Sequence, residues 1–196
     1  NGSQINVGGL VATTKNLTDE NFQVGNFVFE GNSSASILNL GEITTARGGY
    51  VAMMAKEVQN QGRITATLGK VELAGGERFT LNFNGNSLLK LSIDQGTMDA
   101  LVANGGLIKA DGGTVHLTTQ AVDQVLNGMV NHTGVIEAQT LENRQGEIVL
   151  FAHGGTAHVA GHLDTSAPQQ GDGGFIETSG QKIDIVNKKS QVTHTL

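Results

Sequence analysis

The sequence contains no cysteine, no tryptophan and a single proline, Pro168. Without cysteine the chain has no disulfide framework, no thiolate zinc site, no iron–sulfur cluster and no cysteine nucleophile. Charged residues make up only 15% of the chain, and acidic residues outnumber basic ones, which leaves a formal net charge of −6. Binding to nucleic acid or to an anionic membrane depends on clustered positive charge, so we expect neither.

Long apolar runs and aromatic side chains are also scarce. No stretch approaches the roughly 18–20 apolar residues of a membrane-spanning helix, so we expect no membrane insertion. Seven Phe and one Tyr supply little volume for the core of a compact globule of 196 residues. Glycine, in contrast, is abundant, with 28 residues. This composition favours a narrow core of stacked aliphatic side chains and therefore a repeat architecture.

Two short motifs recur along the chain. The first, Asn-x-Gly-x-Ile, first appears at residues 39–43, and the second, Gly-x-Val/Ile-x-apolar, first appears at residues 49–53. We interpret the spacing of the first motif as a repeat of about 20–22 residues, in which an interval of 44 residues holds two units and other long intervals hold insertions. The apolar residues that close the first motif are Ile43, Ile64, Ile108, Ile136 and Leu163.

Each repeat is predicted to contain two or three short strands separated by Gly/Asn turns. Strands that pair only with the next coil are typical of a parallel β-helix, which we expect to form one domain over residues 1–196. An antiparallel sandwich is the alternative, although hairpin turns do not separate the repeats. The predicted inward stacks are Ile43, Ile64, Ile108 and Ile136 on one wall and Val51, Val71, Val115 and Ile148 on another, whereas Lys70, Glu72, His116 and Glu147 are expected to face water.

Two stretches interrupt this repeat. Residues 79–93 alternate between apolar and polar around Asn84-Gly85-Asn86, which predicts a β-hairpin that projects from the helix or caps one face of it. Apolar residues at helical spacing predict a short α-helix over residues 120–127. Residues 166–173 are expected to form an exposed loop.

Ordered motifs at the start of the chain carry a resemblance. Residues 4–14 read Gln-Ile-Asn-Val-Gly-Gly-Leu-Val-Ala-Thr-Thr, and residues 16–22 and 25–29 continue the pattern. They resemble the "VNVGGLVAST" stretch of the two-partner secretion domain and the segment next to it. This domain is also called the filamentous haemagglutinin-type or haemagglutination-activity domain. Residues 134–138 and 173–180 are similar to segments of large secreted adhesins of this type. The resemblance covers essentially the whole chain.

The sequence departs from the family in one hallmark. The family's Asn-Pro-Asn-Gly turn is not present, and Asn1 is expected to begin just after it. Residues 1–100 would then be the later part of the secretion domain, without the amino-terminal cap that the family uses in transporter recognition. Residues 101–196 would continue the β-helix.

The resemblance implies a right-handed parallel β-helix that is exported through a TpsB-type outer-membrane β-barrel transporter. It further implies an extracellular or cell-surface protein that adheres to host cells, surfaces or biofilm matrix through a glycan or protein receptor, with no enzymatic activity. We expect the hairpin and the first coils to contact a partner, and the residues predicted to do so are Phe79, Leu81, Phe83, Asn84, Leu89 and Leu91.

Other functions receive less support. A carbohydrate- or glycoprotein-binding module, including capture of a haem carrier, is the main alternative. A polysaccharide-cleaving enzyme needs clustered carboxylates, whereas the acidic residues here are spread at one per coil or fewer. His158 and His162 are about 13 Å apart along an extended strand, which is too far for one metal ion unless Gly161 folds the chain back, and we expect His153, His158 and His162 at the surface. No cofactor is expected.

Overall fold

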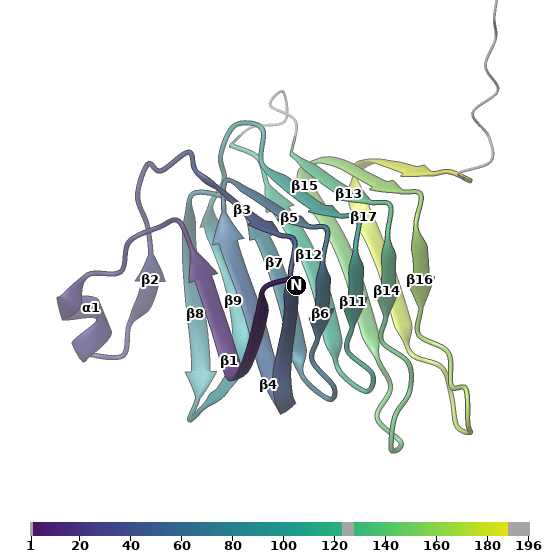
Figure 1. The fold of residues 1–196 in the computed structure, drawn as a ribbon. Coiled ribbons are helices and arrows are strands. Elements are labelled where there is room, and N and C mark those ends of the chain that lie inside the picture. Colours follow the sequence, from purple (N-terminus) through teal and green to yellow (C-terminus); the bar gives the residue numbers. More distant parts are fainter. Residues whose placement is uncertain (1, 123–127, 188–196) are drawn as a thin grey trace, which may run out of the picture.

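The computed structural model describes residues 2–122 and 128–187, and these form a parallel β-helix with three walls (Figure 1). Wall 1 consists of β3 (Ser36–Asn39), β5 (Glu57–Asn60), β10 (Leu101–Asn104), β13 (Met129–His132) and the later parts of β15 (Glu147–Val159) and β17 (Phe175–Ile185). Wall 2 consists of the first parts of β1 (Gln4–Thr13) and β4 (Glu42–Ala55), followed by β6 (Arg63–Thr65), β11 (Leu107–Lys109), β14 (Val135–Glu137) and β16 (His162–Asp164). Wall 3 consists of the later parts of β1 and β4, then β7 (Lys70–Gly75), β12 (Thr114–Gln120) and the first parts of β15 and β17.

Aliphatic side chains stack inside this helix in register from coil to coil. On wall 2, Ile43 pairs with Ile64, Ile64 with Ile108, Ile108 with Ile136, and Ile136 with Leu163. On wall 3, the corresponding stack contains Val51, Val71, Val115 and Ile148. Ile43 is 3% exposed and the other members named in these two stacks, apart from the half-buried Leu163, are fully buried. Burial of each such side chain stabilises the fold by roughly 1.5–3 kcal/mol, so the two stacks form the main core.

The interval between Ile64 and Ile108 holds one coil rather than the two that we predicted. Ile108 pairs directly with Ile64, so no coil lies between them. The additional residues form an excursion outside the helix that contains β8 (Arg78–Asn84) and β9 (Ser87–Gln95). Spacing alone could not distinguish a second coil from an insertion, because both add a similar number of residues.

A buried ladder of polar side chains follows the corner between walls 1 and 2. Asn39 Nδ2 donates to Asn60 Oδ1 at 2.8 Å, and Asn60 Nδ2 donates to Asn104 Oδ1 at 2.7 Å. His132 continues the ladder, with Nδ1 lying 3.3 Å from Asn104 Nδ2 and Nε2 lying 3.1 Å from the carbonyl oxygen of His162. A neutral imidazole with its proton on Nε2 satisfies both contacts. The asparagine of the first motif is therefore an internal hydrogen-bonding residue.

The glycine of the same motif is required by close packing between coils. A methyl group on Gly106 would overlap the carbonyl oxygen of Gly62, and one on Gly134 would overlap that of Gly106. The backbone amides of the next residues use these carbonyls, since Leu107 donates to Gly62 at 3.0 Å and Val135 donates to Gly106 at 2.9 Å. Only glycine leaves room for this approach at the corner.

A second, smaller sheet lies outside the helix. It contains β2 (Phe27–Phe29), β8 and β9, in the order β2-β8-β9, and all its strands are antiparallel. The predicted hairpin is confirmed, with β8 and β9 joined at Gly85, whose φ is +58°. The described residues contain one α-helix, α1 (Asp19–Gln23), which Figure 1 shows beside β2 at the amino-terminal end of the β-helix.

The helix predicted over residues 120–127 is wrong at its start. Gln120 belongs to β12, and Ala121 forms a parallel bridge with Thr97, while residues 123–127 lie outside the described part of the chain. The bridge to Thr97 therefore replaces the first residues of the predicted helix. Residues 166–173 form a largely exposed loop, as expected.

Candidate partner-binding surface

The outer face of wall 3 supports the extra-helical sheet. Ala52 and Met54 of β4 and Ala74 of β7 point outward and pack beneath this sheet. Phe79, Leu81 and Leu88 cover them from above, and all six of these side chains are 3% exposed or less. The protein therefore has two apolar cores that share wall 3. Two sheets packed face to face lie about 10 Å apart, which fixes the height of the outer sheet above the wall.

Aromatic side chains gather at the amino-terminal end of this second core. A groove of about 830 Å³ lies there, and five of the eight aromatic residues line it. Two pairs of adjacent glycines, Gly8–Gly9 and Gly48–Gly49, also line this groove. The rings pack edge to face, with Phe27 and Phe83 centroids 5.1 Å apart and Phe22 and Phe27 centroids 6.3 Å apart. Phe22 on α1 is 63% exposed, and Arg47 lies on the groove lining. The aromatic residues are Phe22, Phe27, Phe29, Tyr50 and Phe83.

Lys15 holds the segment between β1 and β3, which carries Phe22, Phe27 and Phe29. Its Nζ donates to the carbonyl oxygens of Gly31 at 2.8 Å and Ser33 at 2.9 Å, and the residue is 8% exposed. Burial lowers the pKa of Lys15, and the nearby charge of Glu77 opposes that effect. Two carbonyl oxygens thus replace the water that this ammonium group loses, and they tie the segment before β3 to the end of β1.

A second groove runs along β9 on the other side of the extra-helical sheet. It has a volume of about 370 Å³ and lies between residues 90–93 of β9 and the outward side chains of β12 and β15. Glu72 lines it but does not face water as predicted, because its side chain is only 7% exposed beneath β9. Its Oε1 lies 3.1 Å from His116 Nδ1. Sequence alternation placed Glu72 outside the helix correctly but could not show that a second sheet covers that face.

The same pair perturbs the titration of His116. Burial alone lowers the pKa of His116, but the hydrogen bond to Glu72 and the charges of Glu72 and Glu147 outweigh it. The pKa of His116 therefore lies above its ordinary value of 6.5, although Lys70 acts in the opposite direction. The imidazolium form is favoured between the two carboxylates.

Charged side chains on wall 2 and at its corner form ion pairs and hydrogen bonds with their neighbours. Lys109 Nζ lies 2.7 Å from Glu137 Oε2 and 3.0 Å from Asp111 Oδ2, and the hydrogen bond to Glu137 is the main reason why the pKa of Lys109 is raised. Hydrogen bonds from Ser166, with a further one from Gln139, lower the pKa of Asp164. These groups stabilise the corner loops.

The residues predicted to contact a partner divide into two groups. Phe79 and Leu81 are 0% and 2% exposed and face wall 3, so they cannot contact a partner at the surface. Asn84 and Leu89 are exposed, and Phe83 and Leu91 are half-buried at the rim of the second core. Phe83 and Leu91 pack against the second core with Phe79 and Leu81, so only their exposed parts, with Asn84 and Leu89, are accessible to a partner.

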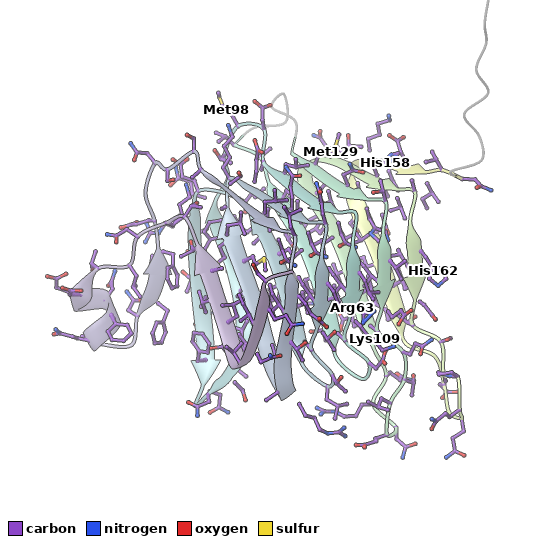
Figure 2. The ribbon with its side chains drawn as sticks, in the orientation of Figure 1. Arg63, Met98, Lys109, Met129, His158 and His162 are labelled. Carbon is purple, nitrogen blue, oxygen red and sulfur yellow. The ribbon has the colours of Figure 1, made fainter. Side chains whose placement is uncertain are left out.

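His158 and His162 are not brought together. His158 lies on wall 1 in register with Asn131, and His162 lies on wall 2 in register with Val135. Figure 2 shows these two side chains at separate places on the surface. Residues 2–122 and 128–187 contain no group of three or more His, Asp or Glu that could hold a metal ion. Within the same residues, no helix is both long and apolar enough to cross a membrane.

The aromatic groove was missed at the sequence level, although a signal for it exists. Residues 50–55 read Tyr-Val-Ala-Met-Met-Ala and are apolar at both parities, whereas a strand with one wet face alternates. Such a run indicates that both faces of a strand are covered. Phe29 of the preceding segment and Phe79, Leu81 and Leu88 of the hairpin supply the cover.

Comparison with known proteins identifies the family. The model of the TPS secretion domain matches residues 1–165. The chain belongs to the TPS secretion domain family. Domains of this family are exported by two-partner secretion, in which an outer-membrane transporter of the TpsB type is the partner. The sequence-level assignment to this family is therefore confirmed.

Relatives of this TPS domain include two proteins of Haemophilus influenzae that carry the name heme/hemopexin-binding protein. One is 33% identical over 165 residues, which covers 77% of this chain and 17% of the relative. The other is 34% identical over 83 residues, which covers 42% of this chain and 9% of the relative. The TPS domain thus spans less than a fifth of either protein.

A solved structure shares the fold. The crystal structure of the HMW1 secretion domain from Haemophilus influenzae superposes with a TM-score of 0.78 at 24% identity, and the match covers 92% of this chain and 46% of that one. This similarity confirms the β-helix predicted from the repeats.

Proposed function

We propose that the extra-helical sheet and the aromatic groove of this TPS domain form the surface that its TpsB-type transporter or an accompanying partner recognises. The observation that carries this proposal is the concentration of five of the eight aromatic residues in one groove. Aromatic side chains are enriched at protein interfaces, because each provides a large contact area at a low cost in conformational entropy. Asn84, Leu89 and Leu91 extend the same surface along the hairpin.

Export of the exoprotein in the presence of its cognate barrel tests this assignment. We expect Phe22→Ala and Phe83→Ala to reduce the amount exported several-fold, because both rings are accessible in the groove. Phe175→Ala is the matched control, since Phe175 is 58% exposed on β17 at the opposite end of the helix. Export that continues without the barrel, or that Phe175→Ala impairs equally, would remove the proposal.

We further propose that the exoprotein containing this TPS domain acts in adhesion at the cell surface, through a host-cell or matrix receptor. A long β-helix is suited to this role because each coil docks on the previous one and the stem can extend from the cell. A strain producing the exoprotein should attach to cells or matrix more strongly than an otherwise identical strain that lacks it. Equal attachment would contradict the adhesion role.

Capture of haem or of a haem carrier is the second candidate. It is favoured by the names of the two Haemophilus influenzae relatives, which match this domain over up to 77% of its length. Immobilised exoprotein would then retain hemopexin, and it would do so in preference to serum albumin. Retention of neither protein would leave adhesion as the better assignment.

A further inference from the structure

The outer edge of β9 is open. β9 pairs with β8 on one side, and within the described residues no strand pairs with its other side. The strand contains nine residues, from Ser87 to Gln95, and none of them is proline. Such an edge presents unpaired backbone donors and acceptors to an extended chain that lies beside it, although the carbonyl oxygen of Leu89 already accepts from Lys70 Nζ at 2.6 Å. In Figure 1, β8 lies on the amino-terminal side of β9, so the free edge of β9 faces toward the later coils of the β-helix.

A groove of about 370 Å³ lies beside this edge. Residues 90–93 of β9 form its side, and the outward residues of β12 and β15 form its floor. The extra-helical sheet stands about 10 Å above wall 3, so a chain at the level of β9 would place alternate side chains on that floor. Phe151 is 36% exposed there and contacts His153 edge to face, with ring centroids 5.7 Å apart. The floor therefore offers an apolar contact that no part of the described chain covers.

The charges in this groove favour an acidic ligand. Lys90, His116 and His153 line it. Glu72 is the one carboxylate among its lining residues, and that group is buried against His116. His116 Nε2 is buried 3.7 Å from Glu147 Oε1, so Glu72 and Glu147 balance the charge of His116. The exposed charge among the lining residues is therefore the ammonium group of Lys90, and it favours an acidic partner.

We propose that this groove binds an extended, acidic segment of another protein, which adds to the β2–β8–β9 sheet as a fourth strand. Backbone hydrogen bonds to β9 would provide affinity, and side chains that contact Phe151 on the floor and Lys90 on the neighbouring strand would provide selectivity. A second copy of this chain does not fit, because the coils formed by β12, β15 and β17 extend beneath the groove where its β-helix would have to lie. The site lies on the extra-helical sheet but does not include the aromatic groove, so peptide binding and export are tested with different residues.

The test uses a labelled ten-residue peptide in which valine alternates with threonine and glutamate. Fluorescence anisotropy should show saturable binding to the protein, and hydrogen exchange should show new protection of amides in β9. The same peptide N-methylated at alternate residues should not bind, because methylation removes the backbone donors. Binding of the N-methylated peptide with unchanged affinity would overturn the proposal, and so would a lack of binding by the unmodified peptide or a lack of protection in β9.

Two substitutions examine the side chains. Lys90→Glu should weaken binding about tenfold, since it replaces a charge-assisted contact by repulsion. Phe151→Ala should weaken binding through loss of the floor contact. Lys182→Glu makes the same charge change on β17, away from the groove, and should have no effect. Equal weakening by Lys90→Glu and Lys182→Glu would indicate attraction to net charge rather than this site and would contradict the proposal.

Discussion

At the scale of single residues, two adjacent glycines show how strictly the corner between walls 1 and 2 is packed. A methyl group on Gly105 would meet only Thr133 Oγ1 at 3.6 Å, an ordinary van der Waals contact. The same group on Gly106 would overlap the carbonyl oxygen of Gly62, which accepts a backbone hydrogen bond from Leu107. The two positions are neighbours in sequence but differ completely in their freedom to change.

We therefore expect Gly106→Ala to lower the free energy of unfolding by at least about 2 kcal/mol, because the coils must separate locally. Gly105→Ala should change it by less than about 0.5 kcal/mol. Urea unfolding followed by circular dichroism measures both values. Equal stability of the two variants would mean that the glycine column does not set the distance between coils.

The Glu72–His116 pair predicts a pH dependence of stability. The pKa of His116 is raised in the folded state, so the folded protein binds the proton more tightly than the unfolded chain does. The resulting stabilisation is complete below the ordinary pKa of 6.5 and is lost as the pH rises through the higher folded-state value. The charged groups that face His116 are Glu72, Glu147 and Lys70.

Comparison of the wild type with His116→Gln isolates this effect from other titrations. The stability difference between them should be largest near pH 5 and should shrink above the ordinary pKa of 6.5. Glu72→Gln should flatten the pH dependence in the same way, whereas substitution of a residue facing water would leave it unchanged. A difference that grows with pH would show that the sign of the shift is wrong.

At the scale of elements, the hairpin of β8 and β9 packs on wall 3, and Phe79 is its one fully buried aromatic ring. Phe79 is fully buried against Met54, Ala74 and their neighbours. Phe79→Ala should cost about 3–5 kcal/mol, the usual range for removal of a buried aromatic side chain. Leu89→Ala on the same hairpin is the control, and it should be nearly neutral because Leu89 is 53% exposed. Thermal melts of the two variants test whether the outer sheet is an integral part of the fold.

The sequence allowed some elements to be predicted and others not. The inward stacks and the hairpin could be predicted from alternation and from the Asn-Gly turn, because these are local signals. The number of coils between Ile64 and Ile108 was wrong, since an excursion and a coil have similar lengths. The helix at residues 120–127 was wrong at its start because tertiary pairing with Thr97 overrides local spacing.

For the candidate site, the sequence indicated the hairpin but not the surface beneath it. Phe79 and Leu81 were expected at the surface, whereas the hairpin turns them inward onto wall 3. The buried position of Glu72 depends on the same covering sheet. Contacts between distant segments decide both outcomes, and a single sequence contains no direct signal for them.

At the scale of the whole molecule, the register predicts that one coil can be removed cleanly. Deletion of residues 129–155 would join Gly128 to Thr156, which already occupies the position equivalent to Met129. Val130, Ile136 and Ile148 would be replaced by Ala157, Leu163 and Ile176, all of which match them in register. We expect the shortened protein to fold, with a smaller urea m-value in proportion to the surface lost.

Circular dichroism and equilibrium unfolding check this expectation. Deletion of residues 133–160 is the control, because it leaves the corner between walls 1 and 2 one residue short. It would put His162 in the place of Gly134, where any side chain overlaps the carbonyl of Gly106, so this variant should fold far less well. Disorder in the protein that lacks residues 129–155 would show that the coils are not interchangeable layers.

The ladder of Asn39, Asn60, Asn104 and His132 has a consequence for how such a chain can acquire new parts. Every excursion in the described residues leaves the helix at one of the two other corners, whereas the ladder corner always passes directly from one wall to the next. Foreign sequences, such as an epitope or an enzyme domain, should accordingly be grafted between walls 3 and 1 or between walls 2 and 3. The hydrogen bonds at the ladder corner should keep the later coils in register, whatever is inserted at the other two corners.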